Sequence, residues 1–176
     1  GNIADSNTNY GISFVDSLNN RIVNNTAVNN ARGIFLQRSS ESEILDNLAL
    51  NNNYGIRLFS GMNCSISGNE VSNCNASGIS LLSSADCSIS ENSLSNNSLG
   101  IDLELSNNTV ILNNTIQKGG RGISLRDSSY NLVSNNMALN NRYGFYISRS
   151  HWTTLINNTA STSVNHGIVL LNSTNN

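Results

Sequence analysis

The feature that most constrains this chain is the sequence Gly-Ile-x-Leu, which recurs eight times, in places as a close variant. Successive copies begin 22 or 23 residues apart along the 176 residues. A fixed period of this length is typical of repeat architectures, in which one short unit stacks on copies of itself. The glycines that begin the copies are Gly11, Gly33, Gly55, Gly78, Gly100, Gly122, Gly144 and Gly167.

Each repeat carries apolar residues at alternate positions. Counted from the glycine as position 0, the residues at +1 and +3 are apolar, and those at +2 and +4 vary. Because alternate residues of a strand face opposite sides, this pattern predicts a strand with one buried face. Isolated apolar residues at +11 and +16 predict two further short strands, and no segment has helical spacing. We therefore expect three short strands in each coil.

Polar residues also keep fixed places in the repeat. Position +14 is always Asn, and position +6 is nearly always Ser. If successive coils stack at about 4.8 Å, the Asn amides form a ladder in which each side-chain carbonyl accepts a hydrogen bond from its neighbour. Such a ladder satisfies the polar groups of a buried turn. The expected structural ladder is Asn25, Asn47, Asn69, Asn92, Asn114, Asn136 and Asn158.

Together these patterns predict an all-β fold, a single-stranded parallel β-helix of about eight coils of 22–23 residues. We expect it to be right-handed because parallel crossover connections are right-handed. We expect one domain over residues 1–176, which forms a slice of a longer array.

The composition argues against several classes of partner. The chain contains 35 Asn, is 11% charged and has a net charge of −2. Its basic residues are scattered, so we expect no nucleic-acid binding, and no apolar run approaches the ~20 residues of a membrane span. His151 and His166 stand alone in different turns, so we expect no metal and no cofactor. Cys64 and Cys87 both fall at +9, and we expect free thiols in the core.

The motif GI-x-L-x-x-S-x-x-N-x-I-x-x-N-x-A/I-x-NN resembles the NosD-like and CASH-type (carbohydrate-binding and sugar-hydrolase) parallel β-helix repeats over the whole chain. Asn-rich repeats of this type occur in surface proteins of methanogenic archaea. The resemblance implies a right-handed β-helix and an extracellular or cell-surface location. It does not select one activity, because such repeats occur in lyases, hydrolases, epimerases, a copper-enzyme assembly factor and envelope proteins.

In polysaccharide-active proteins of this type, the substrate lies along the first strand of each coil. The outward residues of these strands, with the residue before each glycine, hold most of the aromatic and arginine side chains of the chain. Such side chains suit sugar rings and carboxylates. Because every turn is short, we expect a flat, open face. The glycan-binding candidates are Phe35, Arg57, Asp102, Glu104, Arg126 and Tyr146.

Asp102 and Glu104 form the sharpest cluster, because they lie on the same face of one strand with Arg126 in the next coil. A carboxyl pair with an arginine could serve a glycoside hydrolase or a lyase. The alternative, which we favour, is a solvated ion pair between adjacent strands.

Three functions are compatible with these observations. The first is a non-catalytic exported or cell-surface module, a rigid spacer that binds polysaccharide or cell-envelope glycan on its first-strand face. The second is a polysaccharide lyase or glycoside hydrolase that uses Asp102, Glu104 and Arg126. The third is a subunit that self-associates through its open ends into a filament, since uncovered strand edges pair with other chains.

Overall fold

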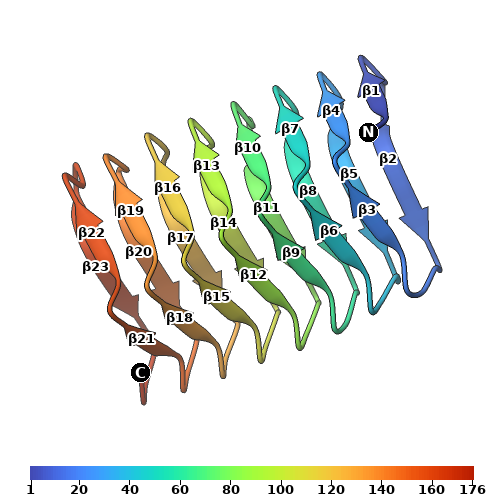
Figure 1. Ribbon diagram of the computed structural model, residues 1–176. Helices are drawn as coiled ribbons and strands as arrows, with labels where there is room; N and C mark the ends of the chain where they lie inside the picture. The colour runs from blue at the N-terminus through green and yellow to red at the C-terminus, as the bar shows by residue number, and fades with distance from the viewer.

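A computed structural model describes residues 1–176 and contains β-strands without helices. The chain winds as a rod with its termini at opposite ends (Figure 1). Each coil passes once through each of three parallel sheets of eight, seven and eight strands. The prediction of an all-β parallel solenoid with three strands per coil is therefore confirmed. None of the chain forms a helix that could span a membrane.

The first sheet contains the Gly-Ile-x-Leu strands, which are six residues long. They are β2 (Tyr10–Val15), β5 (Arg32–Gln37), β8 (Tyr54–Phe59), β11 (Ser77–Leu82), β14 (Leu99–Glu104), β17 (Arg121–Arg126), β20 (Tyr143–Ser148) and β23 (His166–Leu171). We call the outer surface of this sheet the first-strand face.

The other two sheets consist of three-residue strands. The strands around +11 are β3 (Arg21–Val23), β6 (Glu43–Leu45), β9 (Ser65–Ser67), β12 (Ser88–Ser90), β15 (Val110–Leu112), β18 (Leu132–Ser134) and β21 (Thr154–Ile156). The strands around +16 are β1 (Ile3–Asp5), β4 (Thr26–Val28), β7 (Leu48–Leu50), β10 (Glu70–Ser72), β13 (Ser93–Ser95), β16 (Thr115–Gln117), β19 (Met137–Leu139) and β22 (Thr159–Ser161).

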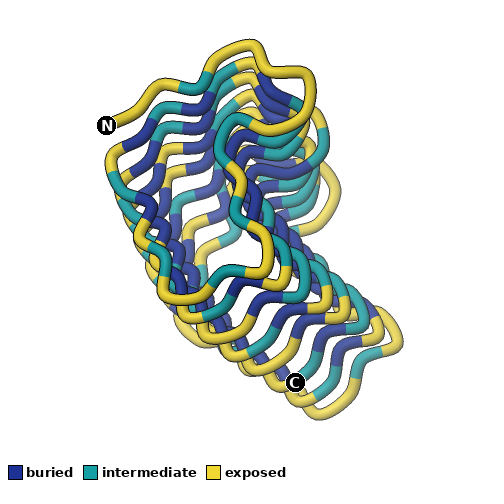
Figure 2. Tube along the Cα trace, turned by 90° about the vertical axis from the view of Figure 1, so that its right-hand side faces the viewer, coloured by how far each residue is buried: buried dark blue, intermediate teal, exposed yellow.

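Equivalent positions of successive coils stack directly on one another. In the first sheet, for example, Ile101 pairs with Ile123 and Leu103 pairs with Leu125. The apolar residues at +1, +3, +11 and +16 therefore form continuous buried rows inside the rod (Figure 2). Rows of this kind make each coil a template for the next, so the variable residues on the outside are also held in register.

The turns are held by ladders of polar side chains. At +14, each Asn from Asn25 to Asn136 donates its side-chain amide to the Oδ1 atom of the next Asn at 2.9–3.1 Å, ending at Asn158. At +6, the Ser106 backbone N–H donates to Ser128 Oγ at 3.0 Å. These bonds satisfy backbone groups that would otherwise be buried without partners.

A second Asn row at +19 was not predicted. Asn30 donates to Asn52 Oδ1 at 3.2 Å, and the buried Asn97 and Asn141 side chains bond to strand carbonyls. The row is broken where Cys74, Gly119 and Ser163 take the Asn position.

Four residues of each coil adopt left-handed backbone conformations, with φ near +55°. In the coil that begins at Gly100, these corners include Asn113 (φ 56°) and Asn108 (φ 54°). Asn tolerates this region better than most residues. The Asn-rich composition therefore follows from the number of tight corners in each coil as well as from the ladders.

The three cysteines, Cys64, Cys74 and Cys87, are free thiols and all are buried in the core. Burial raises the pKa of the Cys74 thiol to about 11. The neighbouring Cys87 thiol lowers the pKa of the Cys64 thiol to about 7. All three side chains fill the core as small apolar groups.

Candidate functional site

The first-strand face is not flat along its length. The residues at +2 point outward, yet Phe35, Ser80, Asp102 and Ser124 are at most 8% exposed because side chains of adjacent rows cover them. The expectation of a flat face is therefore wrong in its central part. The +2 row forms the floor of shallow hollows, and the residues at −1 and +4 form their sides.

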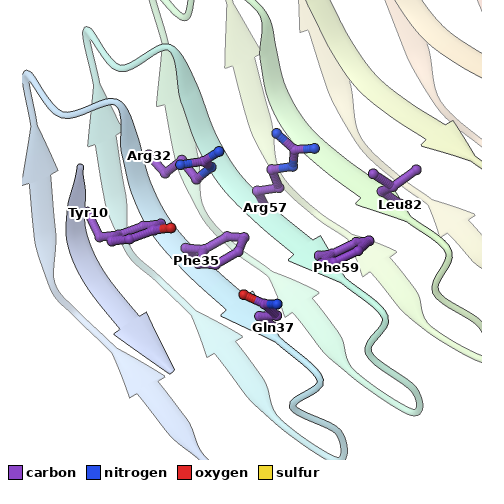
Figure 3. Close-up of a pocket in the computed structure, with 7 residues that line it drawn as sticks. All are labelled: Tyr10, Arg32, Phe35, Gln37, Arg57, Phe59 and Leu82. Atoms are coloured by element: carbon purple, nitrogen blue, oxygen red, sulfur yellow. The ribbon is translucent and has the colours of Figure 1, made fainter. Parts of the chain in front are cut away.

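The first hollow lies over β2, β5, β8 and β11, with a volume of about 250 Å³ (Figure 3). Tyr10 in its side and Phe35 in its floor stack their rings, with centroids 4.9 Å apart. The Arg32 guanidinium lies 5.2 Å from the centroid of each ring. The residues that line the hollow are Tyr10, Arg32, Phe35, Gln37, Arg57, Phe59 and Leu82.

A second hollow adjoins the first and shares Arg57 and Leu82 with it. It contains Asp102, Glu104 and Arg126, so the structure brings the carboxyl cluster of the sequence together. Arg126 Nη2 donates to Glu104 Oε2 at 2.6 Å, and both side chains are about two-fifths exposed. This geometry is that of a partly solvated ion pair between adjacent coils.

Asp102 differs from Glu104 because it is buried and makes no ion pair within 4 Å. Burial raises the pKa of the Asp102 carboxyl, and the positive charge of Arg126 acts in the opposite direction. Asp102 and Glu104 thus place two carboxyl groups in one hollow, the first buried and the second paired with Arg126.

A third group of side chains lies further along the rod. The Arg121 guanidinium lies 3.8 Å from the centroid of the Tyr146 ring, and Tyr143 packs edge-on against Tyr146 at 5.7 Å. Arg142 approaches the other tyrosine, with its guanidinium 5.7 Å from the Tyr143 ring centroid. These contacts repeat the arginine–aromatic pairing of the first hollow.

The arginines separate into two groups by their partners. Away from the first-strand face, Arg21, Arg38 and Arg149 each pair with a carboxylate of a neighbouring coil. On and beside this face, Arg126 pairs with Glu104, but four arginines have no carboxylate within 4 Å and contact aromatic rings instead. These four unpaired arginines are Arg32, Arg57, Arg121 and Arg142.

The six candidate residues of the sequence do lie on one face, but in different places. Phe35 and Arg57 belong to the first hollow, the Asp102 cluster belongs to the second, and Tyr146 belongs to the third group. The site also includes residues that were not singled out as candidates. Most of them precede a repeat glycine, and their shared position was the available signal: Tyr10, Arg32, Tyr54, Arg121 and Tyr143.

Aromatic residues are not confined to this face. Tyr130 and Trp152 stack at 5.0 Å in the turn at +8, and both rings are about half exposed. No arginine lies over either ring. The combination of arginine and aromatic side chains, rather than aromatic residues alone, therefore distinguishes the first-strand face.

Comparison with known proteins gives two family matches. The model described as "Periplasmic copper-binding protein (NosD)" matches residues 1–73. Copper is usually held by clustered histidine and sulfur ligands. No three His, Cys, Asp or Glu side chains in this chain are placed to share a metal ion, and the cysteines are buried in the core. The residues present therefore do not fit a copper site.

Several solved structures share the fold at low sequence identity. The periplasmic alginate epimerase AlgG is 18% identical with a TM-score of 0.72, over 88% of this chain and 49% of the epimerase. The enzymatically active domain of bacteriophage CBA120 tailspike protein 2 is 13% identical with a TM-score of 0.74, over 96% of this chain and 32% of that domain.

An alginate lyase from Paenibacillus sp. is 10% identical with a TM-score of 0.61, over 99% of this chain and 78% of the lyase. A search of curated protein sequences gives no match. This chain thus spans less than half of the epimerase and of the tailspike domain. The model described as "Right handed beta helix region" matches residues 50–176, which is most of the chain. The chain therefore belongs to the right-handed β-helix family.

Proposed function

We propose that this chain is an exported, non-catalytic β-helix module that binds polysaccharide along its first-strand face. The observation that carries the proposal is the arginine–aromatic row over β2, β5 and β8, in which Arg57 is shared by two adjoining hollows. Aromatic rings stack on the apolar faces of sugars, and guanidinium groups donate hydrogen bonds to their oxygens. A long, continuous face of this kind suits an extended polymer better than a small molecule.

The comparisons support this proposal at the level of the fold. The epimerase and the lyase are named for alginate, and the NosD name specifies the periplasm. A periplasmic or cell-surface location would place the chain where such polymers occur. The regular short turns, in which each coil repeats the last, favour a rigid binding or spacer module.

The proposal can be tested by measuring binding to a panel of neutral and acidic polysaccharides, with Arg57→Ala and Tyr146→Ala as variants. We expect the wild-type chain to bind at least one polymer. Arg57→Ala should weaken the affinity about tenfold or more, because it removes one charge-assisted hydrogen bond. Arg21→Ala is the matched control, because Arg21 lies on β3 and pairs with Glu43. Failure to bind any polymer, or equal losses in all variants, would contradict the proposal.

A second candidate function is a polysaccharide lyase or glycoside hydrolase centred on Asp102 and Glu104. The specific observation in its favour is the buried Asp102 carboxyl with its raised pKa, beside the Glu104–Arg126 pair. New reducing ends or unsaturated products, formed by the wild-type chain and abolished in Asp102→Asn, would replace the non-catalytic proposal. Head-to-tail stacking stays a prediction, which light scattering over a concentration series would test.

A further inference from the structure

The unpaired arginines are divided by the carboxyl cluster into two groups. The N-terminal group is Arg32 and Arg57, and the C-terminal group is Arg121 and Arg142. Building on the proposed function, we infer that the polysaccharide carries spaced negative charges, with anionic sugars at the two arginine groups and an uncharged sugar over Asp102. The ligand class is thus an acidic polymer whose charges are interrupted, and neither a neutral nor a uniformly charged one.

The N-terminal group lacks a hydrogen-bond acceptor. The Nε atoms of Arg32 and Arg57, like that of Arg126 in the second hollow, are buried and have no partner. Buried polar groups in folded proteins nearly always have a partner, so an unpaired donor in a hollow marks a place for one. A carboxylate or sulfate is the acceptor that a guanidinium binds best, through two parallel hydrogen bonds. The stacked rings of Tyr10 and Phe35 hold Arg32 in place for such a contact.

The C-terminal group also pairs arginine with aromatic side chains, although neither of its arginines has a buried donor without a partner. Arg121 is held over the Tyr146 ring, and Arg142 lies beside Tyr143. Both arginines, with Tyr143, line a separate shallow hollow next to β14. Neither guanidinium has a carboxylate within 4 Å, so its charge is available to a ligand.

The segment between the groups has the opposite character. Arg57 on β8 and Arg121 on β17 are three coils apart, which is about 14 Å at strand spacing. The intervening strands β11 and β14 present Ser80, Asp102 and Glu104 in the second hollow. Arg126 Nη2 donates to Glu104 Oε2 at 2.6 Å, so the Glu104 carboxylate offsets the charge of Arg126, although the Nε atom of Arg126 has no partner.

A carboxylate placed over this segment would therefore face like charge. Sugar hydroxyl groups, by contrast, can donate to carboxylate oxygens and exchange hydrogen bonds with serine. The net charge of the whole chain is −2, so long-range attraction does not draw polyanions to it indiscriminately. Selection for charge therefore arises at the two arginine groups.

Galacturonan offers a matched set of probes, because methyl esterification removes its carboxylate charges and keeps its backbone. We would measure binding of the 176-residue chain to unesterified, partly esterified and fully esterified galacturonan by calorimetry. Hyaluronan, in which charged and uncharged sugars alternate, and carboxyl-reduced hyaluronan form a second matched pair. We expect the partly esterified polymer and hyaluronan to bind about tenfold more tightly than their uncharged counterparts.

Variants separate the two parts of the inference. Arg57→Gln and Arg121→Gln should each weaken binding of the interrupted polymers about tenfold, whereas Arg21→Gln on β3 should not. Asp102→Asn should tighten binding of unesterified galacturonan, because it removes a negative charge that repels the carboxylates of the polymer. Circular dichroism and urea unfolding verify that each variant is folded.

The outcomes distinguish this inference from the function on which it rests. If the wild-type chain bound unesterified galacturonan, the uniformly charged polymer, most tightly, the inference that the ligand's charges are interrupted would be wrong. If the charged and uncharged members of both pairs bound equally well, the inference of an anionic ligand would be wrong, and the proposal of polysaccharide binding would stand. Binding to no member of either set, nor to the wider panel above, would overturn both.

Discussion

Asn92 Oδ1 accepts two hydrogen bonds from Asn69 of the preceding coil, one from the backbone N–H and one from the side-chain amide, both at 2.9 Å. Asn92 in turn donates to the Ile66 carbonyl at 3.0 Å and to Asn114 Oδ1 at 2.9 Å. Replacing Asn92 with Ala leaves several buried groups without partners. We expect the free energy of unfolding to fall by on the order of 3 kcal/mol, measured by urea denaturation.

The matched control for this variant is Asn53→Ala. Asn53 is an exposed Asn in a turn of the same rod, and its side chain makes no hydrogen bond. We expect a change within about 0.5 kcal/mol. Similar losses of unfolding free energy in both variants would show that the buried Asn ladder does not stabilise the fold more than an exposed Asn does.

Gly100 and Gly167 occupy the same repeat position but differ in the space around them. A Cβ atom at Gly100 would meet Ile116 Cγ2 at 2.3 Å and the Gly122 carbonyl oxygen at 2.5 Å, whereas at Gly167 the nearest atom is 3.4 Å away. We expect Gly100→Ala to lower the unfolding free energy by about 1–3 kcal/mol. Gly167→Ala should leave the unfolding free energy nearly unchanged, and thermal melts of both variants would measure the two effects. Equal losses of stability would contradict the closer packing around Gly100.

The fold could be predicted from the sequence because one period fixes every coil at once. Knowing that Ile101 and Ile123 share a position was enough to stack them, and their pairing follows. The Asn row at +19 could not be recognised in the same way. Its pattern is interrupted at Cys74, Gly119 and Ser163, so it lacks the invariance that marks position +14.

The candidate site was predictable only in part. The period places Glu104 beside Arg126, and the ion pair follows from that register. Burial of the outward Asp102 could not be read from the pattern, because it depends on how neighbouring side chains of other rows lie over it. The approach of Arg142 to Tyr143 depends on turn geometry, which lies outside the strand period.

Asp102 should give the stability a specific pH dependence. Its pKa in the folded chain is raised by burial, while an unfolded Asp titrates near pH 3.9. Its contribution is therefore fully present below pH ~3.9 and is lost as the pH rises through the raised folded pKa. We expect Asp102→Asn to gain stability relative to wild type between pH 4 and pH 7, measured by urea unfolding. A difference in unfolding free energy that stays constant across this pH range would contradict a buried Asp102 carboxyl with a raised pKa.

The buried thiols predict slow chemical labelling. Cys64, Cys74 and Cys87 are each 2% exposed, and the raised pKa of Cys74 keeps that thiol protonated at neutral pH. We expect iodoacetamide to modify none of the three in the folded chain within minutes and all three in urea, as counted by mass spectrometry. A mass lower by two hydrogens, from a disulfide, would contradict the free thiols.

The central claim is that polysaccharide binds the first-strand face through its unpaired arginines. Arginine modification with phenylglyoxal, followed by peptide mass spectrometry with and without bound polymer, tests it directly. We predict that the polymer protects Arg32, Arg57 and Arg121 from modification and leaves Arg21 and Arg149, on other parts of the rod, unchanged. Protection of Arg21 and Arg149 instead, or equal protection of all arginines, would contradict the account.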